Sequence, residues 1–169
     1  MVQGPLYTPE QRARRDQSPW TIVQAILAPL QFLVFLVSLG LVVYYLGIPD
    51  GEAAKESAFL WATVSIVIKT LILYSIMVTG AIWEKVVFGK YLFAPAFFWE
   101  DVFSMLVIAL HTAYLVALFT GADPFVQMMI ALAAYGTYVI NAGQFLWKLR
   151  MARLQGARED AKRRAGASA

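Results

Sequence analysis

Four long apolar stretches, in which charged side chains are nearly absent, constrain the fold of this chain more than any other feature. They are residues 20–46, 57–83, 102–120 and 124–147. A helix of about 20 apolar residues crosses the hydrocarbon core of a bilayer, so each stretch is long enough to be a span. Apolar residues make up 60% of the sequence and charged residues 15%, a balance that excludes an ordinary soluble domain. The sequence therefore predicts an all-α integral membrane bundle of four transmembrane helices.

Lysine and arginine lie mainly in the two terminal segments and in the connection between the second and third spans. The first connection contains only Lys55, among acidic residues, and the third contains none. Connections rich in lysine and arginine stay on the cytoplasmic side of a membrane. We therefore expect an antiparallel bundle with both termini and the aromatic-rich middle connection in the cytoplasm. Its helices are expected at about residues 20–46, 57–83, 100–120 and 124–150.

The expected organisation has three parts: a cytoplasmic tail at residues 1–19, the transmembrane domain at 20–150, and a basic, mobile cytoplasmic tail at 151–169. The basic tail reports topology, and it is also suited to lie on anionic lipid. The net charge of +3 is too weak and scattered for a nucleic-acid surface. The absence of cysteine excludes disulfides and thiolate chemistry, and a single histidine excludes a histidine-rich metal site.

The connection between the second and third spans, residues 83–101, is far too apolar for an ordinary loop. Seven aromatic residues lie there among three carboxylates: Trp83, Phe88, Tyr91, Phe93, Phe97, Phe98 and Trp99 with Glu84, Glu100 and Asp101. One interpretation is an interfacial anchor, with the rings in the lipid headgroups and the charges in water. The other is a lid that covers a planar, partly apolar ligand and supplies protons to it. We expect residues 88–98 to form a short interfacial helix or a re-entrant turn broken near Pro95, with the aromatic side chains substantially buried.

Two ionisable side chains inside the spans need a reason, because a charge near the bilayer centre costs about 2.5–3.5 kcal/mol. Lys69 lies too far from either end of its span to reach the interface, so it must face protein or a cavity. His111 follows Glu100 by three helical turns and lies on nearly the same face. Ser104 and Tyr114 belong to the same stripe. The stripe runs from the cytoplasmic surface to mid-membrane, which is the geometry of a proton route or of a binding site.

Polar side chains also follow the first and fourth spans. Gln24 and Gln31 belong to one stripe of the first span, while Gln127, Tyr138 and Asn141 share a face of the fourth. For each of these residues the plainer interpretation is hydrogen bonding between helices. The buried lysine and histidine are harder to explain in this way.

Two runs of the sequence carry a family resemblance: LYTPEQRARRDQSPWTIVQAILAPLQFLVFLVSL at residues 6–39 and WEKVVFGKYLFAPAFFWEDVFSMLVIALHTAY at 83–114. They resemble the 3-vinyl bacteriochlorophyllide hydratases of phototrophic bacteria, and the likeness extends in the same order from residue 6 to about 154. The resemblance implies a small multi-pass enzyme of the bacterial inner membrane that acts in bacteriochlorophyll synthesis. Such enzymes add water across the C3 vinyl group of a chlorophyllide or bacteriochlorophyllide and give a 1-hydroxyethyl group. The resemblance assigns no catalytic residues, and the tail beyond Leu154 departs from the family.

The implied reaction requires an acid and a base. An acid protonates the terminal vinyl carbon, and water then attacks the carbon nearer the ring while a base accepts its proton. Glu100 is the favoured acid, because it shares the stripe of Ser104 and His111. Asp101 points about 100° away and is expected to cap or orient, so at most one of the two faces the bundle axis, and Glu84 is the reserve acid. No cofactor and no metal site of the protein are implied, since the magnesium belongs to the substrate.

The planar macrocycle is expected to contact aromatic and polar side chains. These substrate-binding candidates are Gln31, Lys69, Trp83, Tyr91, Phe97, Phe98, Trp99, Ser104, Tyr114, Tyr138 and Asn141. In one interpretation Lys69 pairs with the substrate propionate, while His111 ligates the magnesium axially or relays protons. In the other, Lys69 is neutral and donates a hydrogen bond to Gln31 or Asn141.

Two other functions fit the same residues. In a non-catalytic pigment carrier, His111 binds the magnesium and no chemistry follows. In a small proton-conducting transporter, the stripe from Glu100 to His111 and Lys69 relay protons. Substrate and membrane lipid are the expected partners, while other pigment-synthesis enzymes or a second copy of the chain remain open. Incubation with chlorophyllide discriminates among the three functions, because only the hydratase returns a hydrated product.

Overall fold

The computed structural model describes residues 6–167, and within this range every regular element is a helix. The five helices are α1 (Pro9–Gln17), α2 (Pro19–Gly47), α3 (Ala54–Phe88), α4 (Phe98–Phe119) and α5 (Pro124–Ala167). By length and composition, α2, α3, α4 and the Pro124–Arg158 part of α5 are each able to cross a membrane. The prediction of an all-helical chain with four candidate spans is confirmed.

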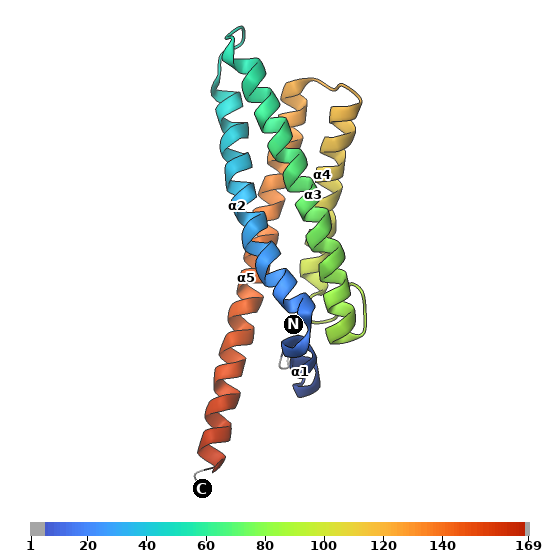
Figure 1. The fold of residues 1–169 in the computed structure, drawn as a ribbon, viewed down its shortest axis with the longest axis vertical. Coiled ribbons are helices and arrows are strands. Elements are labelled where there is room, and N and C mark those ends of the chain that lie inside the picture. Colours follow the sequence, from blue (N-terminus) through green and yellow to red (C-terminus); the bar gives the residue numbers. More distant parts are fainter. Residues whose placement is uncertain (1–5, 168–169) are drawn as a thin grey trace.

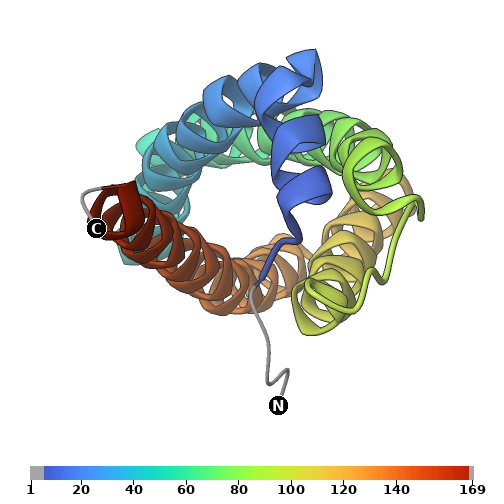
Figure 2. The same cartoon turned by 90° about the horizontal axis from the view of Figure 1, so that it is seen from below.

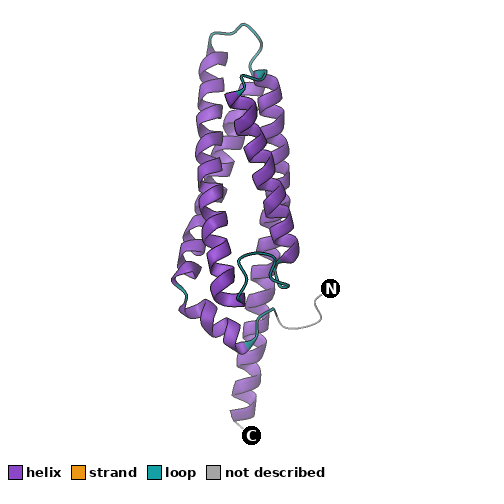
Figure 3. Cartoon of the chain, turned by 90° about the vertical axis from the view of Figure 1, so that its right-hand side faces the viewer, coloured by secondary structure: helices purple, strands orange, loops and turns teal. Residues whose placement is uncertain are grey.

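The four long helices lie side by side, and the chain runs up α2, down α3, up α4 and down α5 (Figure 1). α2 packs chiefly on α3, and α4 packs chiefly on α5, so the bundle consists of two helical hairpins that face each other. The connection 89–97 and α1 lie at one end of the bundle, and the other two loops lie at the opposite end (Figure 3). Seen from below, α1 crosses beneath the bundle (Figure 2).

Cap residues explain where the helices begin and end. α1 starts with a capping box, in which the side chain of Thr8 accepts from the amide of Gln11 and the side chain of Gln11 accepts from the amide of Thr8. α3 ends at Phe88 and is capped by Gly89, whose φ of 81° lies in the left-handed region that favours glycine. At the start of α5, the carboxylate of Asp123 accepts a hydrogen bond of 2.8 Å from the amide of Phe125.

Large apolar side chains cover the outer faces of the four long helices. More than half of the surface of each of the following is exposed: Ile26, Val37, Leu71, Val116 and Leu146. A protein surrounded by water buries most such side chains, whereas lipid solvates them. The outer surface therefore agrees with four spans in a bilayer.

Small side chains line the face of α3 that meets α2. Ala58, Ala62 and Ser65 recur at helical spacing and are buried. Ser65 Oγ lies 2.7 Å from Ser38 Oγ of α2. Since lipid gives no hydrophobic drive for helices to associate, close approach at small residues and hydrogen bonds between helices hold such pairs together.

The connection between α3 and α4 differs from the expectation of a short helix with buried rings. α3 continues to Phe88, and residues 89–97 form bends and a turn that includes Pro95. The burial prediction is wrong for three rings, since these are 39–61% exposed: Tyr91, Phe93 and Phe98. Phe97, in contrast, is 5% exposed. The backbone of the connection turns its amides inward to buried carboxylates, and this orientation directs most of its side chains outward.

The terminal segments are helical where the sequence suggested tails. α1 follows the Thr8 cap, and α5 continues from the last span to Ala167 without a break. The division of the chain at residues 19 and 150, and the mobility of the basic segment, stay predictions. Residues 1–5 and 168–169 lie outside the described residues.

Two neighbouring alanines of α5 provide a matched test of packing inside the bundle. Ala134 is fully buried, whereas Ala133 is exposed. Ala134→Leu forces extra carbon atoms into a close-packed interior, and we expect a loss of about 1–3 kcal/mol in the free energy of unfolding. Ala133→Leu adds the same atoms to the outer face and should change this free energy by less than about 0.5 kcal/mol. Thermal unfolding in detergent measures both variants, and equal transitions would contradict the arrangement.

Candidate functional site

A group of buried polar side chains, termed the central cluster, joins all four long helices in the middle of the bundle. Its members are Ser38 of α2, Ser65 and Lys69 of α3, His111 of α4 and Tyr135 of α5. Ser38 Oγ lies 2.7 Å from Ser65 Oγ and 2.5 Å from the Tyr135 hydroxyl. Lys69 Nζ lies 2.9 Å from His111 Nε2, and both side chains are completely buried. The structure thus places the two ionisable residues of the spans in direct contact.

The hydrogen bonds of His111 define its tautomer. Nδ1 lies 2.8 Å from the carbonyl oxygen of Val107, which only accepts, so Nδ1 carries the ring proton and donates it. In the neutral ring Nε2 is then the acceptor for Lys69 Nζ. His111 is therefore the hydrogen-bond partner of Lys69, in place of Gln31 or Asn141. Nε2 is able to ligate a magnesium ion only if Lys69 moves away from it.

Aromatic rings surround the remaining sides of the Lys69 ammonium group. Nζ lies 4.2 Å from the ring centre of Tyr138, 5.1 Å from that of Tyr135 and 5.8 Å from that of Phe35. The faces of aromatic rings attract a cation. All of these rings are neutral, so none of them supplies an anion to Lys69.

Three buried carboxyl groups, termed the carboxylate cluster, lie at the end of the bundle that carries the 89–97 connection. They belong to Glu84 of α3 and to Glu100 and Asp101 of α4. Asp101 Oδ2 accepts a hydrogen bond of 2.6 Å from the amide of Phe93, and Glu84 Oε2 accepts one of 3.2 Å from the amide of Ala94. The two carboxyl groups thus bind the amides of consecutive residues, which brings Glu84 and Asp101 close together.

Phe93, whose amide binds Asp101, has an unusual backbone conformation. Its φ of 58° is left-handed, a conformation that costs a bulky residue about 1–3 kcal/mol. The hydrogen bond to Asp101 holds Phe93 in this conformation. Asp101 is therefore bonded to the connection, and its expected role in capping or orienting stays a prediction.

Glu100 is also buried, but it faces α5. Glu100 Oε2 lies 3.6 Å from Lys148 Nζ, which donates a hydrogen bond to the carbonyl group of Ala96. One turn along α4, Ser104 Oγ accepts a hydrogen bond of 2.9 Å from Asn141 Nδ2. The stripe of Glu100, Ser104 and His111 thus faces the interior along its whole length.

An aromatic cluster closes the same end of the bundle. Phe97 lies 5.7 Å, between ring centres, from both Trp83 and Phe88, and 6.1 Å from Phe145 of α5. Tyr7, which precedes α1, stacks on Phe88 at 5.7 Å. The N-terminal segment is therefore part of the packing around the connection.

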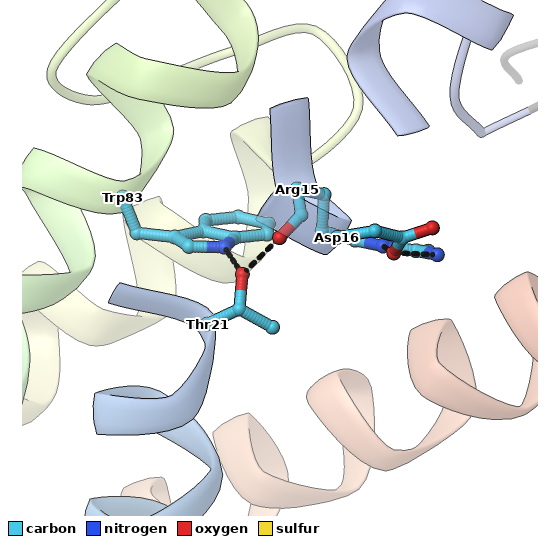
Figure 4. Close-up of polar contacts among 4 residues, drawn as sticks. All are labelled: Arg15, Asp16, Thr21 and Trp83. Carbon is cyan, nitrogen blue, oxygen red and sulfur yellow. Dashed lines mark hydrogen bonds and ion pairs between the residues drawn. The ribbon is translucent and has the colours of Figure 1, made fainter. Parts of the chain in front are cut away.

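Hydrogen bonds tie the aromatic cluster to the junction of α1 and α2 (Figure 4). Trp83 Nε1 donates to Thr21 Oγ1 at 2.9 Å, and this hydroxyl donates to the carbonyl oxygen of Arg15 at 2.6 Å. The guanidinium group of Arg15 lies 4.8 Å from the ring centre of Tyr7 and 2.6 Å from the carboxylate of Asp16. Burial raises the pKa of Tyr7, and the charge of Arg15 opposes this effect.

The structure groups some of the sequence-predicted site residues and separates others. The central cluster and its cage contain Lys69, His111 and Tyr138. The carboxylate cluster and its neighbours contain Glu84, Glu100, Asp101, Ser104 and Asn141. Trp83 and Phe97 belong to the aromatic cluster, and Gln31 and Tyr114 are buried in the interior. Tyr91, Phe98 and Trp99 lie on the surface.

The sequence reasoning missed three residues of these sites. Ser38 lies seven positions after Gln31, and Tyr135 lies three positions before Tyr138. Extending the two polar stripes by one or two helical turns would have found both. Lys148 contributes to the sequence prediction only as one of the basic residues that indicate the cytoplasmic side. Nothing in its spacing links it to Glu100.

A hollow of about 530 Å³ lies at the opposite end of the bundle, between the two other loops. Its lining includes Asp50, Lys55 and Asp123 but none of the sequence-predicted site residues. The Lys55 ammonium group pairs with Asp50 and lowers the pKa of that carboxyl group. Among residues 6–167, no group of three or more histidine, aspartate or glutamate side chains is arranged to hold a metal ion.

These features define a helical membrane protein with four candidate spans, a polar interior and buried carboxyl groups at one end. A family model described as 2-vinyl bacteriochlorophyllide hydratase (BCHF) matches residues 7–151. The chain belongs to this family. The resemblance found in the sequence is thereby confirmed, since the position numbers 2 and 3 of the vinyl group reflect different numbering of the macrocycle.

Two relatives show how far the similarity extends. The chain is 74% identical over 156 residues to the 2-vinyl bacteriochlorophyllide hydratase of Rhodobacter capsulatus. The aligned residues make up 92% of this chain and 87% of that protein. It is also 74% identical over 149 residues to the protein of the same name from Cereibacter sphaeroides. This alignment includes 88% of this chain and 89% of the relative. No solved structure matches the chain.

Proposed function

We infer that this chain is a membrane hydratase of bacteriochlorophyll synthesis, which adds water across the vinyl group of a bacteriochlorophyllide to give a 1-hydroxyethyl group. The observation that carries this conclusion is the 74% identity, over nearly the whole chain, to relatives that bear the name of this activity. Hydration of a vinyl group requires one group that gives a proton and one that accepts a proton. The buried carboxyl groups of Glu84, Glu100 and Asp101 provide both types of group.

The activity is tested by incubating membranes that contain the chain with a vinyl-bearing chlorophyllide. We expect a product heavier by one water, with an absorption spectrum that reflects loss of the vinyl conjugation. Membranes without the chain serve as the control. Bound but unaltered pigment would instead indicate a carrier, and a chain that ignores the pigment would agree with a transporter; either result contradicts the hydratase.

We propose that the four helices cross the bacterial inner membrane in alternating directions, with both termini and the 89–97 connection in the cytoplasm. The excess of lysine and arginine in the terminal segments and in the middle connection supports this orientation. The exposed rings of Tyr91, Phe98 and Trp99 are placed to contact the headgroup layer on that side. In this orientation, the carboxylate cluster lies at the cytoplasmic end of the bundle.

The orientation is tested by labelling single cysteines, which is clean in this chain because the natural sequence has none. We expect Glu52→Cys to react with a membrane-impermeant thiol reagent added to intact cells. Lys90→Cys should react only after the membrane has been opened. The reverse pattern, or equal labelling of both variants in intact cells, would reject the orientation.

We propose that the substrate propionate pairs with Lys69, and that the macrocycle extends from there toward the carboxylate cluster. The neutral cage around Lys69 supports this placement, because it leaves the ammonium charge without an anion. When Lys69 turns to the propionate, Nε2 of His111 becomes free to ligate the substrate magnesium or to relay a proton. Addition of water is not a redox reaction, so the proposed mechanism includes no cofactor beyond the magnesium of the substrate.

The pairing with Lys69 is tested by comparing a chlorophyllide with its propionate methyl ester. Esterification and Lys69→Met each remove one partner of the same ion pair. We therefore expect them to weaken binding by similar factors and to be non-additive when combined. Equal affinity for acid and ester in the natural chain would reject the assignment.

A further inference from the structure

Several buried acceptor atoms lack a hydrogen-bond partner among the described residues, and they include Oε2 of Glu100 and Oδ1 of Asn141. These two residues are 5% and 7% exposed. Ser104 links them, because it lies one turn after Glu100 on α4 and accepts from Nδ2 of Asn141 at 2.9 Å. Buried acceptors are costly to leave unpaired, so this arrangement points to a ligand that donates hydrogen bonds. Water, the second substrate of a hydratase, is such a donor and has two hydrogens to give.

Lys148 places a positive charge beside Glu100. Lys148 Nζ lies 3.6 Å from Oε2, which is too long for a hydrogen bond but close enough for electrostatic attraction. The hydrogen bond from Lys148 to the Ala96 carbonyl group holds the ammonium group in this position. A carboxyl group that faces an ammonium group and a bound water has the geometry of a general base, which takes a proton from that water.

Glu84 and Asp101 are arranged differently from Glu100. Both carboxyl groups are buried and lie close together, because they bind the amides of two consecutive residues. Two carboxylate charges in one buried place repel each other, which favours a proton on one member of the pair. The amides of Phe93 and Ala94 occupy one oxygen of each group and fix the pair in place. A pair that retains a proton in a buried position is a proton donor.

We propose that Glu100 and Asn141 bind the attacking water and that Glu100 removes its proton, while the Glu84–Asp101 pair protonates the vinyl group. This assignment rests on the proposed hydratase function. It reverses the role that the sequence favoured for Glu100, and it makes Lys148 a positioning residue, which holds the Glu100 carboxylate beside the water site.

The π electrons of the vinyl group form a C–H bond to the terminal carbon with the proton of the Glu84–Asp101 pair, and an O–H bond of that pair breaks. The resulting cation lies on the carbon attached to the ring. A lone pair of the water oxygen forms the C–O bond, and the second O–H bond of that water gives its proton to Glu100. Return of this proton to the Glu84–Asp101 pair through solvent completes the addition of one water.

The two roles are separated by running the reaction in deuterium oxide. If protonation of the vinyl group reverses before water attacks, the terminal vinyl carbon exchanges hydrogen for deuterium without hydration. We expect Glu100→Gln to lower hydration about 100-fold or more, with vinyl exchange kept within about tenfold of the natural chain. Glu84→Gln and Asp101→Asn should lower both by about 100-fold or more, while pigment that stays bound during purification shows that these variants are folded.

Asn141 and Lys148 test the water site itself. Asn141→Leu should lower hydration about tenfold or more and leave exchange intact, because it removes one acceptor of the water. Gln127→Leu is its matched control: Gln127 also has a buried, unpartnered amide oxygen on α5, but it lies at the other end of the helix and should not change hydration. Lys148→Met should behave like Glu100→Gln, and Lys148→Arg should restore hydration.

The exchange and hydration rates of these variants distinguish the acid from the base. Loss of vinyl exchange in Glu100→Gln, with pigment still bound, would show that Glu100 is the acid and would overturn the assignment. Exchange that persists in both Glu84→Gln and Asp101→Asn would overturn it equally. Failure of the natural chain to hydrate the pigment would instead reject the proposed function, which separates that failure from an error in the roles.

Discussion

A lysine in the middle of a membrane-spanning helix must be solvated by protein, and the rest of the bundle depends on how this chain meets that requirement. Each long helix contributes to the surroundings of Lys69: α2 through Phe35, α4 through His111, and α5 through Tyr135 and Tyr138. In lipid, helices associate through packing and polar contacts because burial of apolar surface gives no advantage. The central cluster therefore determines how the two helical hairpins face each other.

The same requirement separates the interior into two chemical regions. Along α4, His111 follows Glu100 by eleven residues, which corresponds to about 16 Å of helix. The buried Lys69 lies at one end of this distance and three carboxyl groups lie at the other. The proposed substrate has an anionic propionate and a reactive vinyl group at different positions on one rigid ring system, so a single bound macrocycle is suited to contact both regions.

The sequence predicted the features that depend on composition and helical spacing. The four spans, and the inward-facing stripe of Glu100, Ser104 and His111, follow from the length of apolar runs and from the period of the helix. Contacts between elements could not be predicted, because they depend on how the helices are rotated against each other. The contact of Lys69 with His111, the approach of Lys148 to Glu100, and the outward rings of Tyr91 and Trp99 are of this kind.

The position of Tyr7 has a practical consequence for handling the protein. Because this ring stacks on Phe88, and the amide of Leu6 donates to Gln155 of α5, the first described residues fill space between two helices of the bundle. Removal or replacement of Leu6 and Tyr7 would therefore disturb contacts with both α3 and α5. The end of α5, in contrast, projects beyond the bundle (Figure 1), so a fusion there leaves the packed end undisturbed.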